Sequence, residues 1–225
     1  MTLEYSGQII KLSAYDKPAR LGITITKRGN AEVLAGNQMR YDFTVANTSN
    51  VPLDSFFWHD RIPTDAAAAT VLTTGTYSTR LNYRILYKTN YQTSYQVLAS
   101  NLLTTTNYSF ALNAIPKQAG EVVTDIYFDF GKVPAGFQSL AGPTLTVNVS
   151  GTAVNGYQLV NRADAGGKYQ APGKPRRQLG HDHSQIYDYT STAQNRLLTL
   201  DGWPSMEGYP SPVYFETCPY QRRSP

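Results

Sequence analysis

The chain has 225 residues, of which 16% are charged and 12% aromatic, with 17 tyrosines and a formal net charge of +4. This length allows one sizeable hydrophobic core, and the tyrosine-rich composition favours sheets over helices. The small basic excess is spread along the chain, which argues against a nucleic-acid partner. The single cysteine, Cys218, excludes an internal disulfide framework and a zinc site built from several thiolates.

The sequence predicts no membrane span, because no run approaches the roughly eighteen apolar residues that a spanning helix needs. Residues 2–5 read Thr-Leu-Glu-Tyr rather than a charged and then apolar leader. We therefore expect either a cytoplasmic protein or a fragment of a longer exported chain.

Residues 1–19 are expected to form a lead-in strand or linker. From 20 to 170, short β-branched and aromatic runs alternate with turn residues, a spacing typical of a sandwich. Within these runs apolar and polar residues mostly alternate, which gives each strand one buried and one wet face. We predict an all-β, immunoglobulin-like antiparallel β-sandwich, whose clearest strands are 21–27, 39–45, 81–87, 125–130 and 145–149.

The alternation ends near residue 170. Residues 171–177 are linker-like in composition, and the segment 171–225 is predicted to be largely disordered or irregular, as a native tail or as a shifted reading frame. It holds His181-Asp182-His183, a triplet that is able to ligate a metal when ordered. Because it lies in this segment, we predict no metal site and no cofactor.

The most informative stretch is a turn between two predicted strands. Asn47 and Asn50 lie in an Asn/Thr/Ser turn that reverses the chain through side-chain bonds to backbone amides, and Pro52 forces an extended entry into the next strand. Asp60 and Pro63 are expected to close that strand as structural residues.

The turn at residues 44–53 and the end of the following strand at residues 60–63 resemble the conserved-repeat domain of bacterial surface proteins known as domain of unknown function eleven. The usual "TVTNTGNVPL" turn appears here as "TVANTSNVPL", and the "D-x-L-P" exit as "DRIP". Short sequence motifs further along the chain, including "FGKVPAGF" at residues 130–137, are similar to a Gram-positive, clostridia-like branch of that family. The resemblance implies a secreted or wall-attached protein, so we expect an extracellular or cell-surface location.

Several residues are of types that take part in catalysis or in covalent bond formation. His59 and Asp60 are adjacent on a strand and so point to opposite faces, which argues against a catalytic pair. Surface sandwiches of this kind sometimes form a Lys–Asn isopeptide bond beside a buried acid. The types available here are Lys11 or Lys27 as the amine, Asn148 as the amide, and Asp42 or Glu32 as the acid, although Asn148 falls on the face opposite Leu145 and Val147.

Tyrosines recur through one predicted hairpin region, where they form either a stacking surface for a glycan or protein, or ordinary half-buried sheet residues. The tyrosines are Tyr77, Tyr83, Tyr87, Tyr91 and Tyr95.

No nucleophile elbow, metal set or phosphate loop accompanies these residues. The sequence therefore predicts that the chain is not an enzyme but a non-catalytic structural or spacer module of a bacterial cell-surface or secreted protein. The alternative is an adhesive module that binds cell-envelope or host glycan or protein through its tyrosines.

Overall fold

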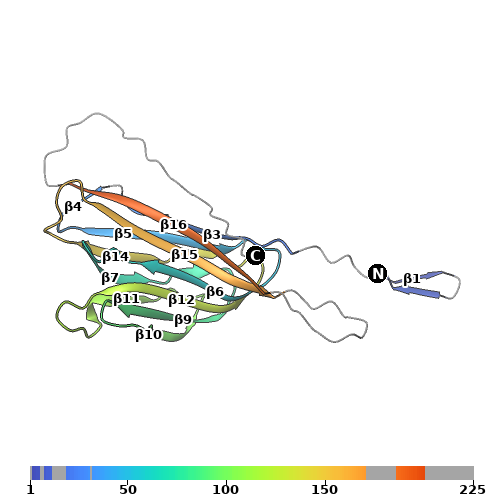
Figure 1. Ribbon diagram of the computed structural model, residues 1–225. Coiled ribbons are helices and arrows are strands. Elements are labelled where there is room, and N and C mark those ends of the chain that lie inside the picture. The colour runs from blue at the N-terminus through green and yellow to red at the C-terminus, as the bar shows by residue number, and fades with distance from the viewer. Residues whose placement is uncertain (1, 6–7, 12–18, 31, 171–185, 201–225) are drawn as a thin grey trace, which may run out of the picture.

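The computed structural model describes residues 2–5, 8–11, 19–30, 32–170 and 186–200, and the side chains of 19–30 and 32–169. Two large sheets face one another (Figure 1). The seven-stranded sheet has the order β10 (Gln96–Leu103), β9 (Asn82–Thr89), β12 (Val123–Val133), β6 (Leu53–Arg61), β15 (Gln158–Gln170), β16 (Ile186–Leu200) and β4 (Glu32–Leu34). The five-stranded sheet has the order β11 (Ser109–Ala111), β7 (Ala67–Thr73), β14 (Thr144–Val149), β5 (Gln38–Asn47) and β3 (Ile23–Arg28).

Two small sheets and one short helix complete the described part of the chain. β1 (Thr2–Tyr5) pairs with β2 (Gln8–Lys11) in a hairpin set apart from the sandwich (Figure 1). β8 (Thr76–Tyr77) pairs with β13 (Ser139–Ala141), and the 3-10 helix η1 spans Leu112–Ala114. No helix among the described residues is long and apolar enough to cross a membrane.

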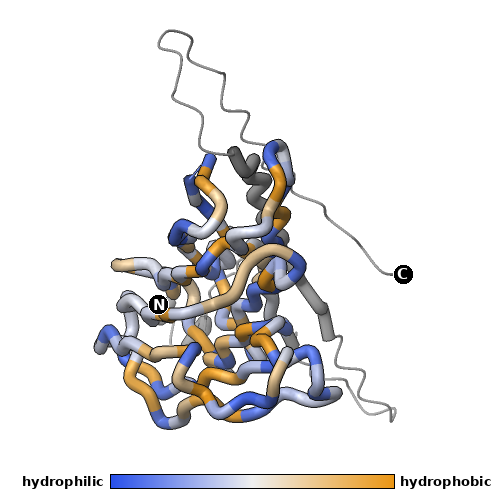
Figure 2. Tube along the Cα trace, turned by 90° about the vertical axis from the view of Figure 1, so that its left-hand side faces the viewer, coloured by the Kyte–Doolittle hydropathy of each residue, from blue (hydrophilic) through white to orange (hydrophobic). Residues whose placement is uncertain are grey.

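The predicted all-β antiparallel sandwich is confirmed, and each of the five predicted runs overlaps a strand, with 39–45, 125–130 and 145–149 lying wholly within one. Hydrophobic and hydrophilic residues alternate along the strands (Figure 2). In β5, Met39, Tyr41, Phe43 and Val45 are all buried, while Arg40 and Asp42 are exposed. The inward faces of both sheets meet in one core.

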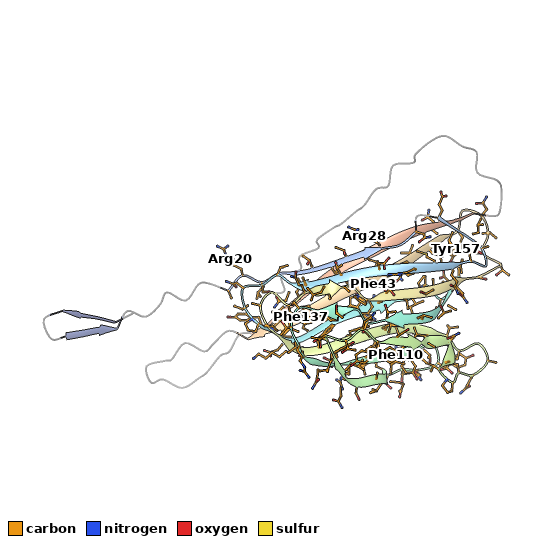
Figure 3. The ribbon with its side chains drawn as sticks, turned by 180° about the vertical axis from the view of Figure 1, so that it is seen from behind. Arg20, Arg28, Phe43, Phe110, Phe137 and Tyr157 are labelled. Carbon is orange, nitrogen blue, oxygen red and sulfur yellow. The ribbon has the colours of Figure 1, made fainter. Side chains whose placement is uncertain are left out.

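That core is rich in aromatic side chains. The Phe43 ring meets Trp58 edge-on at 4.7 Å, and Trp58 in turn meets Phe128 at 4.5 Å. Near one end of the strands Phe137 stacks on Tyr77 at 5.3 Å. Figure 3 shows Phe43 and Phe137 between the layers, whereas Arg28 points away from them. Such ring pairs add to the area that the rings bury, so the sheets are joined by close packing.

The turn after β5 is built as the sequence predicts, through side-chain bonds to the backbone. The buried Asn47 accepts a bond from the Ser49 amide at 3.0 Å and donates to the carbonyls of Val51 and Pro134. Asn50 accepts a bond from the Arg20 amide at 2.7 Å. Pro52 is exposed and directly precedes β6. These contacts fix the entry into β6, which carries part of the site described below.

One described strand lies within the segment 171–225, for which the sequence predicts a largely disordered or irregular tail. β16 pairs with β15 along its length and makes a parallel contact with β4 through residues 198–200. Residues 171–185 and 201–225, including the His181-Asp182-His183 triplet and Cys218, lie outside the described residues.

Candidate active site

Three polar side chains lie in the aromatic core, where apolar residues are the rule. Lys27 on β3, Asp60 on β6 and Asn161 on β15 are all buried, and the side chains of Lys27 and Asp60 have no exposed surface. Each sits at an inward position of its strand, so the alternation of the sheet directs all three into the sandwich. Burying an ion and an amide in this way is costly unless they are paired.

The carboxylate of Asp60 joins the other two groups. Its Oδ1 lies 2.5 Å from the Nζ of Lys27, and its Oδ2 accepts a bond from the Nδ2 of Asn161 at 3.3 Å. β6 and β15 are neighbours in the seven-stranded sheet, with Asp60 opposite Ala163. Lys27 reaches across from the edge strand of the other sheet. One carboxylate therefore holds an amine and a primary amide side by side.

Burial changes the acid–base behaviour of the amine. Loss of hydration lowers the pKa of the Lys27 ammonium from 10.5 to about 8, against the opposing attraction of Asp60 and, more weakly, of Asp164. At pH 7 roughly one amine in ten is then neutral, compared with about one in three thousand for an unperturbed lysine. Neutral amines are nucleophiles and ammonium ions are not, so the environment activates Lys27.

Aromatic rings enclose the amine. The Nζ of Lys27 lies 4.5 Å from the ring centroid of Tyr41 and 4.7 Å from that of Phe43. Such cation–π contacts replace only part of the stabilisation that water would give the ammonium. Because Trp58 covers Phe43 from β6, the site is dry on this side. In such a medium the groups interact more strongly with one another than they would in water.

Of the residue types that the sequence offers for an isopeptide bond, the structure places Lys27 in the core and Asn148, Asp42 and Glu32 on the surface. Lys27 is the buried amine, whereas Asn148, Asp42 and Glu32 are exposed and lie on outward faces. Asp42 instead pairs with Arg40 at 2.6 Å on the surface. The side chain of Lys11 lies outside the part that the structure describes. The amide is Asn161 and the acid is Asp60, neither of which the sequence reasoning assigned.

A signal for both was present in the alternation. Asp60 continues the buried face of Phe56 and Trp58, and Asn161 lies between the buried Leu159 and Ala163. A polar residue at an inward position of a strand marks a buried polar group, which must find a partner. We interpreted Asp60 as a strand-closing residue, but it lies inside β6 and faces the core. Pro63 follows the strand as expected, and its carbonyl accepts a bond from the Ala67 amide at 3.0 Å.

His59 points to the outer face of the same sheet, as its position next to Asp60 predicts. Its Nε2 lies 2.9 Å from Asp125 Oδ1 and 3.2 Å from the hydroxyl of Tyr95. Burial raises the pKa of the Asp125 carboxyl, but hydrogen bonds from His59 and Thr124 outweigh burial and leave the pKa below its usual value. This outer cluster is separate from the buried site.

The five predicted binding tyrosines do not form one surface. Tyr77 and Tyr83 are buried in the core, and burial raises the pKa of Tyr83 to about 12. Tyr87 is half-buried, while Tyr91 and Tyr95 are exposed. Tyr91 donates to the Ala119 carbonyl and Tyr95 contacts His59. The recurrence of tyrosine along the sequence therefore does not translate into a shared binding face.

Comparison with known proteins adds little. No family model matches the chain, and no curated protein matches it either. The family resemblance of the turn and the cell-surface location thus stay predictions. Among solved structures, the chain is similar to AvmM, described as catalysing macrocyclization in alchivemycin A biosynthesis. The match covers 92% of this chain and 99% of that one, at 10% identity and a TM-score of 0.36.

The function predicted from the sequence is corrected here. The comparison with solved structures finds an enzyme, in contrast to the predicted non-catalytic structural, spacer or adhesive module, and neither version of that prediction is carried forward. At this TM-score the likeness itself assigns no activity to the chain.

Proposed function

We propose that this β-sandwich catalyses one reaction on itself, the formation of an amide bond between Lys27 Nζ and Asn161 Cγ with release of ammonia. The observation that carries the proposal is the position of Asp60, whose two carboxylate oxygens contact the amine on one side and the amide nitrogen on the other. An acid in this position contacts both the nucleophile and the leaving group of a transamidation.

The step balances with the groups at hand. The ammonium of Lys27 gives a proton to Asp60 Oδ1, and the nitrogen lone pair forms a bond to Asn161 Cγ while the carbonyl π electrons move to Oδ1 of Asn161. Asp60 takes the second proton from the attacking nitrogen as it protonates Nδ2. The C–N bond then breaks, its electrons leave with ammonia, and the carbonyl re-forms. Asp60 is left holding the proton that the attacking nitrogen lost, and no oxidant or cofactor takes part.

Two features of the fold lower the barrier. The sheets hold amine and amide on one carboxylate, and fixed positions of this kind are equivalent to concentrations of about 10⁵ M or more. Burial also lowers the pKa of the Lys27 ammonium, so passing its proton to Asp60 costs less free energy than it would for a hydrated lysine. Because the product amide remains in the core, the reaction runs once for each chain.

The product would join the two sheets covalently. Lys27 belongs to the five-stranded sheet and Asn161 to the seven-stranded sheet. The buried ion pair, a weak source of stability by itself, is thereby converted into a neutral amide.

Intact mass spectrometry of the denatured protein tests the proposal. We expect the chain to be lighter than its sequence by one ammonia molecule, and a tryptic digest to contain the peptide of Lys27 joined to the peptide of Asn161. Lys27→Arg and Asn161→Leu each remove one reacting group and should restore the full sequence mass.

A matched control uses a lysine elsewhere. Lys132 is exposed and lies 3.7 Å from Asp54, so it too is paired with a carboxylate. Lys132→Arg should keep the mass loss, whereas Asp60→Asn should abolish it in a protein whose circular dichroism remains that of a β-sandwich. A full sequence mass for the unchanged, folded protein would refute the proposed function.

A further inference from the structure

We infer that Tyr41 is a catalytic residue of this reaction, whose hydroxyl donates a hydrogen bond to the oxygen of Asn161 when that oxygen becomes negatively charged. The inference rests on the proposed function and adds the group that stabilises its intermediate. It follows from two buried atoms that have no partner among the described residues, the hydroxyl of Tyr41 and the Oδ1 of Asn161.

Tyr41 is held next to the amine by the strand pairing. β3 and β5 are antiparallel neighbours in which Lys27 lies opposite Phe43, and Tyr41 is two residues along on the same inward face. The Nζ of Lys27 lies 4.5 Å from the Tyr41 ring centroid. The ring is fully buried, so its hydroxyl is fixed in the core close to the reacting groups.

Asp60 leaves one atom of the amide without a donor. Its two oxygens are engaged by Nζ of Lys27 and Nδ2 of Asn161. Among the described side chains, no donor bonds Asn161 Oδ1, and the Tyr41 hydroxyl likewise has no bond of ordinary geometry. Buried polar atoms without partners are rare and call for an explanation. A bond that tightens only in the intermediate explains both.

Asn161 and the Tyr41 hydroxyl also interact electrostatically. Burial, followed by the charge of Asp60, raises the pKa of the Tyr41 hydroxyl, and the Asn161 amide opposes this rise as a hydrogen-bonding side chain. The phenol therefore stays protonated and remains a donor at neutral pH. The Trp58 indole N–H and the hydroxyls of Tyr77 and Tyr83 are further buried donors without a partner among the described groups.

The role of the hydroxyl requires no proton transfer. As the amine adds, the carbonyl electrons of Asn161 move to Oδ1, and the phenol O–H donates to that oxygen until the carbonyl re-forms. Bonds realised mainly in the transition state raise the rate rather than the affinity. Removal of one donor from such a site slows a reaction by about 10²–10³-fold, and we expect Tyr41→Phe to slow bond formation about 100-fold.

The test follows the kinetics of bond formation in the full chain. The protein is made in a cell-free translation system, samples are quenched in acidic guanidinium at intervals, and intact mass gives the fraction that has lost ammonia. Tyr41→Phe is compared with Tyr77→Phe, in which the same substitution removes another buried hydroxyl that has no partner in the described part of the chain. The matched pair separates loss of a donor from loss of a buried polar atom.

We expect Tyr77→Phe to react at the rate of the unchanged protein and Tyr41→Phe to react far more slowly, with both variants folded by circular dichroism. Equal rates for the two variants would overturn the role of Tyr41. Absence of mass loss in the unchanged protein would instead overturn the proposed function, so the two failures are distinguishable.

Discussion

Replacement of Asn161 by leucine tests the crosslink through the stability of the folded domain. The bond would close a loop of about 135 residues, from position 27 to position 161. By the chain-entropy relation for crosslinks, such a loop stabilises the folded state by about 5 kcal/mol. For a domain of this size 1 kcal/mol moves Tm by roughly 2–4 °C, so Asn161→Leu should unfold about 10–20 °C lower.

The substitution itself has a smaller direct effect. Leucine branches at Cγ as asparagine does, although its methyl groups take more volume. The Lys27–Asp60 pair is retained, and the lost bond from Nδ2 is a long one at 3.3 Å, worth about 1 kcal/mol. Scanning calorimetry of the unchanged protein, Asn161→Leu and Lys27→Arg measures the difference, with intact mass confirming the state of the bond. A midpoint for Asn161→Leu within about 5 °C of the unchanged protein would refute the entropic reasoning.

Three further outcomes are expected. The rate of bond formation should be constant below about pH 8 and fall about tenfold per pH unit above it, because the reactive Lys27–Asp60 pair holds one proton that is lost with a pKa of about 8. Samples quenched at intervals over a series of pH values measure this rate. A rate that rises through pH 8 would exclude proton transfer by Asp60 from Lys27 to Asn161. Asp125, whose pKa is depressed, contributes stability that is present above about pH 4 and lost as pH falls through its folded pKa; urea midpoints should therefore fall less on acidification in Asp125→Asn. Phe137→Ala should cost about 3–5 kcal/mol, since the ring is fully buried against Tyr77 and neighbouring rings; denaturant unfolding would show this as a lower midpoint.

The sandwich could be predicted because period-two patterning is a local property of each strand. The run 39–45 shows its buried and exposed faces without reference to any other part of the chain. The turn at Asn47 could be predicted for the same reason, since its bonds reach residues nearby as well as Pro134.

The site could not be assembled from the sequence, because its three residues come from different strands whose neighbours depend on topology. Asp60 and Asn161 meet only because β6 and β15 pair, across about 100 residues of chain. Asn148, which the sequence analysis named, is the same residue type on another late strand, but it faces outward whereas Asn161 faces inward. A search of the sequence for polar residues at inward-facing strand positions would have found Lys27, Asp60 and Asn161, but not that they contact one another.

The connection of Lys27 to Asn161 also decides what a break in the backbone would do. Residues 118–120, between η1 and β12, are exposed and lie inside the segment that the bond would close. A protease cut there would open a ring rather than divide a chain, and the two pieces would remain one molecule in denaturant and reductant. In Asn161→Leu the same cut would release two separate fragments.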